Sequence, residues 1–297
     1  MTMQTNDQAA GLRRILGRQT PKILTLISGG SHCGKTSSAI NLSVALAQAG
    51  RNVLLLDENK GFHNVAAALG LDPDKDLLEA LNGRVAFERT VQTGPEGLMV
   101  LAAGKGVQAL ADTGDETHRR LKAGFERIGR GLDYILVDTV AGASSRLLPF
   151  PRAGQEAILV SGTGGDAQAD AYGMLKLLHQ EPGRGKTRLL ISMVMGEEEG
   201  KAVFRNIEHV ARRYLDAKLD YLGAVAHDAC IRKGGRVGRA VVEMFPDAPS
   251  SRNWREQARR IMQWPACDKD AGLDALVQRL LVAAHPPVAA EVDAVFH

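Results

Sequence analysis

The chain has 297 residues, of which 44% are hydrophobic, so it can bury one large core and we expect one domain with short appendages. Its 37 basic and 34 acidic residues leave a net charge of +3, which singles out neither nucleic acid nor an anionic membrane as a partner. The N-terminal region lacks the apolar core of a signal peptide, and no run of about eighteen apolar residues occurs. We therefore expect neither export by a signal peptide nor a membrane-spanning helix.

The three cysteines indicate a reducing compartment. Cys33, Cys230 and Cys267 are odd in number, far apart and without the spacing of metal ligands. We therefore expect free thiols and a cytoplasmic protein.

The first predicted element in chain order is a short helix over residues 5–17, with Ala9, Leu12 and Leu16 on one face. After Pro21, short apolar segments alternate with longer helical patterns, which predicts βαβ units and a parallel sheet. The predicted strands are residues 23–28, 53–57, 98–102, 134–138, 157–161, 188–194 and 221–226. Because these segments are apolar throughout, helices should cover both faces of the sheet. The predicted fold is a three-layer α/β fold with a mostly parallel sheet, which binds ligands at the carboxyl ends of its strands.

Two later regions interrupt this alternation. The Gly- and Asp-rich residues 104–115 predict a loop before a helix that carries residues 118–128. The tail beyond Pro265 is predicted to be mostly helix. The predicted organisation is an N-terminal segment at 1–20, a main domain at 21–265 and a C-terminal helix and tail at 266–297.

A phosphate-binding motif follows the first predicted strand. Gly29, Gly34, Lys35 and Thr36 fit the pattern G-x-x-x-x-G-K-[ST], and a helical pattern follows them, as this motif requires. In such a loop the backbone N–H groups and the helix N-terminus face phosphate, the lysine reaches the β and γ phosphates, and the threonine binds Mg²⁺. The predicted nucleotide-binding residues are Gly29, Gly30, Ser31, His32, Cys33, Gly34, Lys35, Thr36 and Ser37.

Two carboxylates end neighbouring apolar segments. Asp138 closes one predicted strand, where it could hold the Mg²⁺ shell, and Gly142 lies in the following loop, which could sense the γ-phosphate. Asp57 closes another strand in the same way, although a cap of a helix or turn is the alternative for this residue. The predicted metal-binding residues are Thr36, Asp57 and Asp138.

These motifs and several later blocks resemble the MinD/ParA group of deviant-Walker P-loop ATPases, in the SIMIBI class, and within it the flagellar number regulators called FlhG or FleN. The matching blocks include LLLDENKGFHNVAAALGL, LDYILVDTVAG, LLISMVMGEEEGKAVF, YLDAKLDYLGAVAHDACIRK and RAVVEMFPDAPSSRNWREQARRIMQWP. The resemblance implies a regulator of flagellar number and placement that binds ATP or ADP with Mg²⁺. It also implies a nucleotide-dependent homodimer and partners among flagellar transcription or switch-complex proteins.

The N-terminal segment DQAAGLRRIL resembles the part of these regulators that stimulates an FlhF-type GTPase. The residues that carry this match, and that we predict to bind the partner, are Asp7, Gln8, Ala9, Leu12 and Arg13. The alternative is an ordinary capped amphipathic helix.

Three positions depart from the family pattern. Gly30 replaces the signature lysine that reaches the partner's phosphate in an ATP-bound dimer, although Lys60 in the neighbouring loop could substitute for it. Asn59 replaces the aspartate that orients the attacking water, and an amide cannot accept a proton from it. Ser192, which we also predict to bind the nucleotide, stands where the family presents an asparagine to the nucleotide base. Lys35, Asp57 and Asn59 are the predicted catalytic residues, and the resemblance with these departures implies a weak ATPase.

The resemblance raises two further questions, of membrane and of DNA binding. Relatives end in an amphipathic membrane-binding helix, and residues 273–281 match it with only Arg279 as a basic residue, so packing on the domain is the alternative. The densest basic cluster comprises Arg252, Arg255, Arg259 and Arg260, for which a solvated helix face is more common than nucleic-acid binding. Two alternative functions therefore remain, namely a hydrolysis-deficient scaffold and a ParA-like partitioning ATPase that binds DNA.

Overall fold

The computed structural model of the chain describes residues 20–60, 64–110, 113–147, 156–180, 186–265 and 273–283. The predicted helix at 5–17 and the predicted partner-binding residues Asp7, Gln8, Ala9, Leu12 and Arg13 lie outside these ranges, as does Cys267.

The described residues form one eight-stranded sheet with the order β3-β4-β2-β5-β1-β6-β7-β8. The strands are β1 Lys22–Ile27, β2 Val53–Asp57, β3 Gln92–Thr93, β4 Met99–Ala102, β5 Tyr134–Asp138, β6 Glu156–Ser161, β7 Lys186–Val194 and β8 Leu219–Ala226. All neighbouring pairs are parallel except β3 and β4. The seven predicted strands are confirmed, and only the two-residue edge strand β3 is additional.

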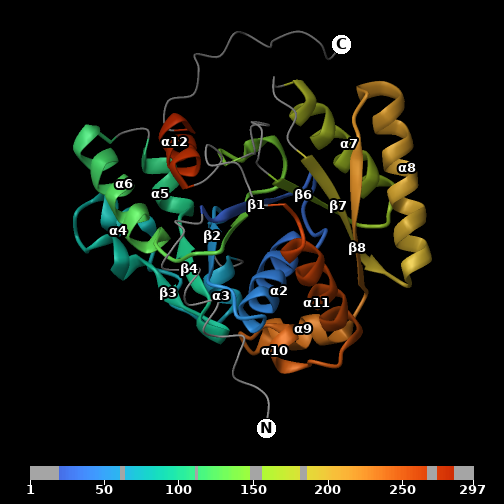
Figure 1. The fold of residues 1–297 in the computed structure, drawn as a ribbon, viewed down its shortest axis with the longest axis horizontal. Helices are drawn as coiled ribbons and strands as arrows, with labels where there is room; N and C mark the ends of the chain where they lie inside the picture. Colours follow the sequence, from blue (N-terminus) through green and yellow to red (C-terminus); the bar gives the residue numbers. More distant parts are fainter. Residues whose placement is uncertain are drawn as a thin grey trace.

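Helices cover both faces of this sheet (Figure 1). They are α2 Lys35–Gln48, α3 Val65–Ala68, α4 Leu77–Leu81, α5 Gly104–Ala109, α6 Asp115–Gly129, α7 Gly165–Gln180, α8 Glu197–Leu215, α9 Ala229–Arg236, α10 Val241–Met244, α11 Pro249–Met262 and α12 Leu273–Ala283. One apolar cluster joins α2, α10 and α11 to one face, whereas two others join α4, α5, α6 and α12, and separately α7 and α8, to the opposite face. The predicted three-layer fold is confirmed.

The predicted loop at 104–115 is wrong, because its first half is the helix α5. The two glycines of this helix allow close packing, since a Cβ at Gly104 would collide with the backbone of Asn59, and one at Gly106 with Leu77. The Asp76 carboxylate also accepts hydrogen bonds from the N–H groups of Lys105 (3.1 Å) and Gly106 (2.8 Å). These contacts offset the low helix propensity of glycine, and no local pattern reveals them.

The sheet order brings the carboxyl ends of β1, β2 and β5 together. Asp57 at the end of β2 is in register with Asp138 at the end of β5, and Asp138 is in register with Leu26 of β1. The loop of residues 28–34 leads from β1 into α2, whose residues from Ser38 to Leu46 are all buried. Trp254 of α11 is 1% exposed and belongs to the same apolar cluster as α2. The predicted phosphate loop therefore stands on a fully packed helix.

Candidate functional site

The loop after β1 has the backbone geometry of an anion cradle. Gly34 is in the left-handed region at φ 82° and precedes α2 without providing a side-chain cap. The first N–H groups of a helix have no intrahelical acceptor, so they are available to a ligand at this end. Ser28 donates from its hydroxyl to the carbonyl of Gly30 (2.9 Å), which holds the start of the loop.

Two of the predicted nucleotide-binding residues, His32 and Cys33, differ in their surroundings. His32 is exposed and has a positive φ of 61°, so its side chain points into no enclosed site. Cys33 is buried, and its burial raises the pKa of the thiol, which keeps it protonated. Neither residue has the surroundings of a catalytic nucleophile.

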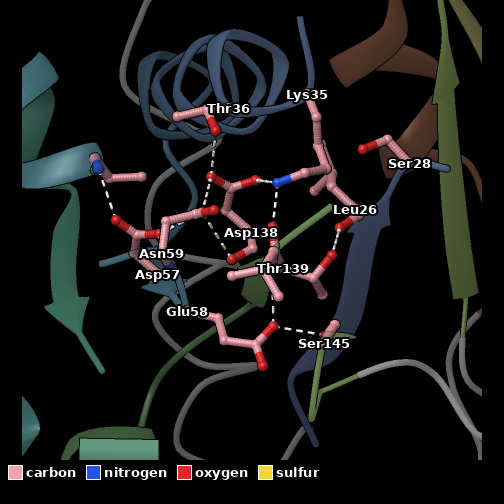
Figure 2. A network of polar contacts seen from close by, with 12 residues as sticks. Leu26, Ser28, Lys35, Thr36, Asp57, Glu58, Asn59, Asp138, Thr139 and Ser145 are labelled. Atoms are coloured by element: carbon pink, nitrogen blue, oxygen red, sulfur yellow. Dashed lines mark hydrogen bonds and ion pairs between the residues drawn. The ribbon is translucent and has the colours of Figure 1, made fainter. Parts of the chain in front are cut away.

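Asp138 contacts the side chains of Lys35 and Thr36, the first two residues of α2 (Figure 2). The Lys35 ammonium forms an ion pair with one carboxylate oxygen and also donates to the carbonyl of Thr139. The Thr36 hydroxyl donates to the other carboxylate oxygen at 2.7 Å. Lys35 and Asp138 are both buried, so this pair is screened little by solvent. The structure thus brings together the predicted phosphate-binding lysine and two of the predicted Mg²⁺-binding residues.

Asn59 connects Asp138 to the second predicted carboxylate. Its side-chain amide donates to Asp57 Oδ1 at 2.8 Å and to Asp138 Oδ2 at 2.9 Å, so one NH₂ group bridges two carboxylates. Asp57 also accepts from the backbone N–H of Asn59 (2.9 Å) and from that of Val65 (2.6 Å) at the start of α3. Asp57 therefore accepts a hydrogen bond at the start of α3, as the alternative of a helix or turn cap predicts. It is also linked to Asp138 through Asn59.

Burial raises the pKa of Asp57 from 3.8 to about 7, and the charge of Asp138 adds to this rise. The hydrogen bonds from Val65 and Asn59 act in the opposite direction. Two buried carboxylates side by side are unfavourable unless a cation or a donor lies between them. Here Asn59 supplies the donor, and the position suits a divalent cation.

Two further contacts shape the start of the loop. Gly142, at φ 72°, donates its N–H to the carbonyl of Ser28 (2.8 Å), so the loop after β5 touches the loop after β1. On the other side lies Asp170 of α7, and a Cβ at Gly29 or Gly30 would come well inside 3.0 Å of it. Gly29 is therefore required for the close approach of the α7 backbone, whereas at Gly30 the obstacle is the end of the Asp170 side chain.

Ser192 lies on β7 and is buried. Its hydroxyl donates to the carbonyl of Cys33 in the loop and also lies 3.4 Å from the carbonyl of Ser161. In this structure Ser192 therefore connects β7 to the phosphate loop through a hydrogen bond.

The residues present fit a nucleotide with Mg²⁺. The uncapped helix N-terminus and Lys35 suit phosphate, while Thr36, Asp138 and Asp57 suit Mg²⁺, which prefers one or two carboxylates together with phosphate oxygens. To reach phosphate, Lys35 would have to leave its ion pair with Asp138. Bound Mg²⁺ would then neutralise the Asp138 carboxylate in place of Lys35.

Two carboxylates near this site were not predicted from the sequence. Glu58 lies between Asp57 and Asn59 and contacts the loop after β5, and Asp170 contacts the loop glycines. Glu58 carried a weak signal, because it extends a run of polar residues at a strand end. Asp170 carried none, since it lies in the middle of a helix far along the chain.

The arginines of α11 are engaged within the domain. Arg255 donates to the carbonyls of Pro246 and Val242, and Arg260 donates to that of Leu222. Arg252 donates to the carbonyl of Asp247, and Arg259 pairs with Glu256. These contacts favour the structural interpretation of the cluster over nucleic-acid binding.

The C-terminal helix α12 packs its apolar face on the core in this structure. Leu276, Val277 and Leu280 are buried in the cluster formed with α4, α5 and α6, and Arg279 is also buried. Across the part of the chain that is described, no helix has the length and apolar character needed to cross a lipid bilayer.

Known proteins are similar to this chain in sequence. Residues 24–239 match the family model of the CobQ/CobB/MinD/ParA nucleotide binding domain. The antiactivator FleN of Pseudomonas aeruginosa is 33% identical over 279 residues, which cover 93% of this chain and 99% of FleN. The flagellum site-determining protein YlxH of Helicobacter pylori is 24% identical over 82% of this chain and 85% of its own length.

Solved structures show the same fold. The MinD cell division protein of Aquifex aeolicus superposes with a TM-score of 0.63 at 23% identity, over 82% of this chain and 98% of that protein. MinD of Pyrococcus horikoshii in complex with Mg-ADP gives a TM-score of 0.61 at 23% identity, over 85% of this chain and 98% of that protein. Since the family model spans most of the chain and FleN matches nearly all of it, the chain belongs to the MinD/ParA family of nucleotide-binding proteins.

Proposed function

We propose that this chain is a FleN-like regulator of flagellar number and placement, whose input is the binding of ATP or ADP with Mg²⁺. The observation that carries the nucleotide part is the convergence of Lys35 and Thr36 on Asp138 at the open N-terminus of α2. The similarity to FleN and YlxH, whose names describe flagellar regulation, supports the biological part. In this proposal Lys35 binds phosphate, and Thr36, Asp138 and Asp57 hold Mg²⁺.

The nucleotide part is tested by calorimetry with Mg-ADP and with Mg-ATPγS. We expect Lys35→Ala to weaken binding by about ten- to a hundredfold, because a charge-assisted contact to phosphate is lost. The matched control is Lys122→Ala, which removes an exposed lysine from α6. Absence of nucleotide binding by the wild-type protein, or equal effects of the two variants, would contradict the assignment.

We propose that ATP turnover is slow. Asn59 stands in the place where the family has a water-orienting aspartate, and here its amide is committed to Asp57 and Asp138. Gly30 supplies no side chain to a partner subunit, and Asp170 fills the space beside it. Both observations also favour a second candidate, a hydrolysis-deficient scaffold that binds partners in a nucleotide-dependent way. Phosphate release under single-turnover conditions distinguishes the two, because the scaffold holds ATP without cleaving it.

Partners remain part of the proposal. The segment that carries Asp7, Gln8, Ala9, Leu12 and Arg13 would bind an FlhF-type GTPase and stimulate it, and the nucleotide-loaded chain would form a homodimer. A peptide of residues 1–20 added to the GTPase tests the first statement, with Leu12→Ala and Arg13→Ala as variants. Stimulation that persists in both variants would remove the assignment of these residues. Sedimentation with liposomes, with and without nucleotide, tests a peripheral membrane contact through α12.

A further inference from the structure

Glu58 is a buried carboxylate that the proposed nucleotide chemistry does not use. It is 5% exposed and lies between Asp57 and Asn59, yet it contacts neither Lys35 nor Thr36. Figure 2 shows its carboxylate beside Ser145, whereas the Asn59 side chain lies between Asp57 and Asp138. The three consecutive residues 57–59 therefore serve two different regions.

The region that Glu58 serves is the loop of residues 139–147 after β5. Oε2 of Glu58 accepts the backbone N–H of Val140 at 3.0 Å and the hydroxyl of Ser145 at 2.6 Å. Oε1 accepts the backbone N–H of Arg146 at 2.6 Å. One side chain thus holds both ends of a single loop, through three hydrogen bonds that each involve a charged acceptor.

Gly142 lies between these fixed ends. Its N–H donates to the carbonyl of Ser28 at the start of the phosphate loop, and its positive φ suits glycine there. A side chain at this position would approach the carbonyl of Gly29 at 3.3 Å. The place of Gly142 relative to the phosphate loop is therefore set by the two ends that Glu58 holds.

A cation lies on the far side of this arrangement. Arg279 of α12 is buried and lies 3.5 Å from the carbonyl of Leu147, which directly follows the segment held by Glu58. Burial lowers the pKa of Arg279 to about 10, and the negative charge of Glu58 opposes that lowering. The buried side chains of Glu58 and Arg279 thus lie on the same side of the loop.

We infer that Glu58 is a positioning residue that fixes Gly142 against the phosphate loop and thereby sets how strongly the protein distinguishes a nucleoside triphosphate from a diphosphate. This inference rests on the proposed function and on the expectation from the sequence that the loop carrying Gly142 senses the γ-phosphate. ADP does not extend to that position. A loosened 139–147 loop should therefore change triphosphate binding while leaving diphosphate binding nearly as it was.

The test compares Glu58→Ala, Glu58→Gln and the control Glu126→Ala, which removes an exposed glutamate from α6. Calorimetry gives the ratio of the Kd for Mg-ATPγS to the Kd for Mg-ADP, and amide exchange without nucleotide reports on residues 139–147. We expect Glu58→Ala to speed exchange in this loop by about tenfold and to change the Kd ratio by about threefold or more. Glu58→Gln should fall between wild type and alanine, since it keeps one acceptor oxygen, and Glu126→Ala should change neither quantity.

Three results would overturn the inference. They are unchanged exchange in 139–147 in Glu58→Ala, an equal change of both Kd values in Glu58→Ala and Glu58→Gln, and effects matched by Glu126→Ala. Failure of the wild-type protein to bind nucleotide is a different outcome. That outcome would overturn both the proposed function and the inferred discrimination between triphosphate and diphosphate. The exchange data would still show whether Glu58 stabilises the loop of residues 139–147.

Discussion

The carboxylate of Asp170 on α7 lies over Gly30, in the space that a side chain at position 30 would enter. The backbone carbonyl of Asp170 lies equally close to the position of a Cβ at Gly29. The two neighbouring glycines thus face different obstacles, a side-chain end that can rotate and a helix backbone that cannot.

This difference predicts unequal costs for two alanine substitutions. Gly29→Ala should lower the free energy of unfolding by about 1–3 kcal/mol, because helix α7 or the phosphate loop must shift. Gly30→Ala should cost less than about 1 kcal/mol, since the Asp170 side chain can turn away. Urea unfolding of both variants measures the two values. Equal losses would mean that the loop and α7 are not packed as described.

Restoring the family's lysine should restore a contact between subunits. In Gly30→Lys we expect self-association with Mg-ATPγS to strengthen by about ten- to a hundredfold, the range expected for one charge-assisted contact to phosphate. Analytical ultracentrifugation measures the dimer constant. Gly30→Ala is the matched control, because it disturbs Asp170 in the same way without adding an ammonium group. If both variants associate equally, lysine at this position has no role between subunits in this protein.

Asn59→Asp should destabilise the nucleotide-free protein and assist turnover. An aspartate cannot donate to Asp57 and Asp138 as the Asn59 amide does, so three carboxylates would lie together. We expect a loss of about 2–4 kcal/mol in the free energy of unfolding at pH 8, which Mg-ADP should partly reverse. Asn59→Ala provides the comparison, since it removes the donor without adding a charge. A thermal melt in which Asn59→Asp is at least as stable as Asn59→Ala would contradict this account.

The raised pKa of Asp57 predicts how stability depends on pH. Between about pH 4 and pH 7 the folded protein keeps a proton on Asp57 that the unfolded chain releases, since the pKa is about 7 in the fold and 3.8 without its environment. The free energy of unfolding should therefore fall as the pH rises through this window, by at most about 1.4 kcal/mol per pH unit, and the contribution of Asp57 should be constant above it.

Urea titrations between pH 4.5 and pH 8 without Mg²⁺ or nucleotide measure the slope of the free energy of unfolding against pH. This slope is set by the difference in bound protons between the folded and the unfolded state. Asp57→Asn should show a smaller slope than wild type in the same window, whatever its absolute stability. Identical slopes in the two proteins would show that Asp57 titrates normally in the fold.

The fold was predictable where the local pattern is strong. The apolar segments that became β2 and β5 are predicted with the bounds that the structure shows, and the phosphate loop lies between a strand and a helix as its motif requires. The edge strand β3 escaped prediction because two residues carry no periodicity. The helix α5 escaped because its glycines are explained only by Asn59 and Leu77, which are distant in sequence.

The candidate site was predictable to the same extent. Lys35, Thr36, Asp57 and Asp138 were found from motif and strand ends, and the structure brings them together. The bridge made by Asn59 and the contacts of Glu58 with the loop after β5 could not be found, because both depend on the pairing of β2 with β5. A local sequence motif predicts which residues lie near a ligand. The contacts among those residues can be predicted only when the order of the strands in the sheet is known.

Helix α2 is enclosed by the sheet on one side and by α10 and α11 on the other, with its residues from Ser38 to Leu46 buried. A helix packed on all sides cannot translate without opening the core, and such an opening is far more costly than the rearrangement of a loop. We therefore expect a conformational change that depends on the bound phosphates to occur on the opposite side of the site, in residues 57–60 and 139–147. We therefore expect a partner that distinguishes one nucleotide from another to bind near those two segments.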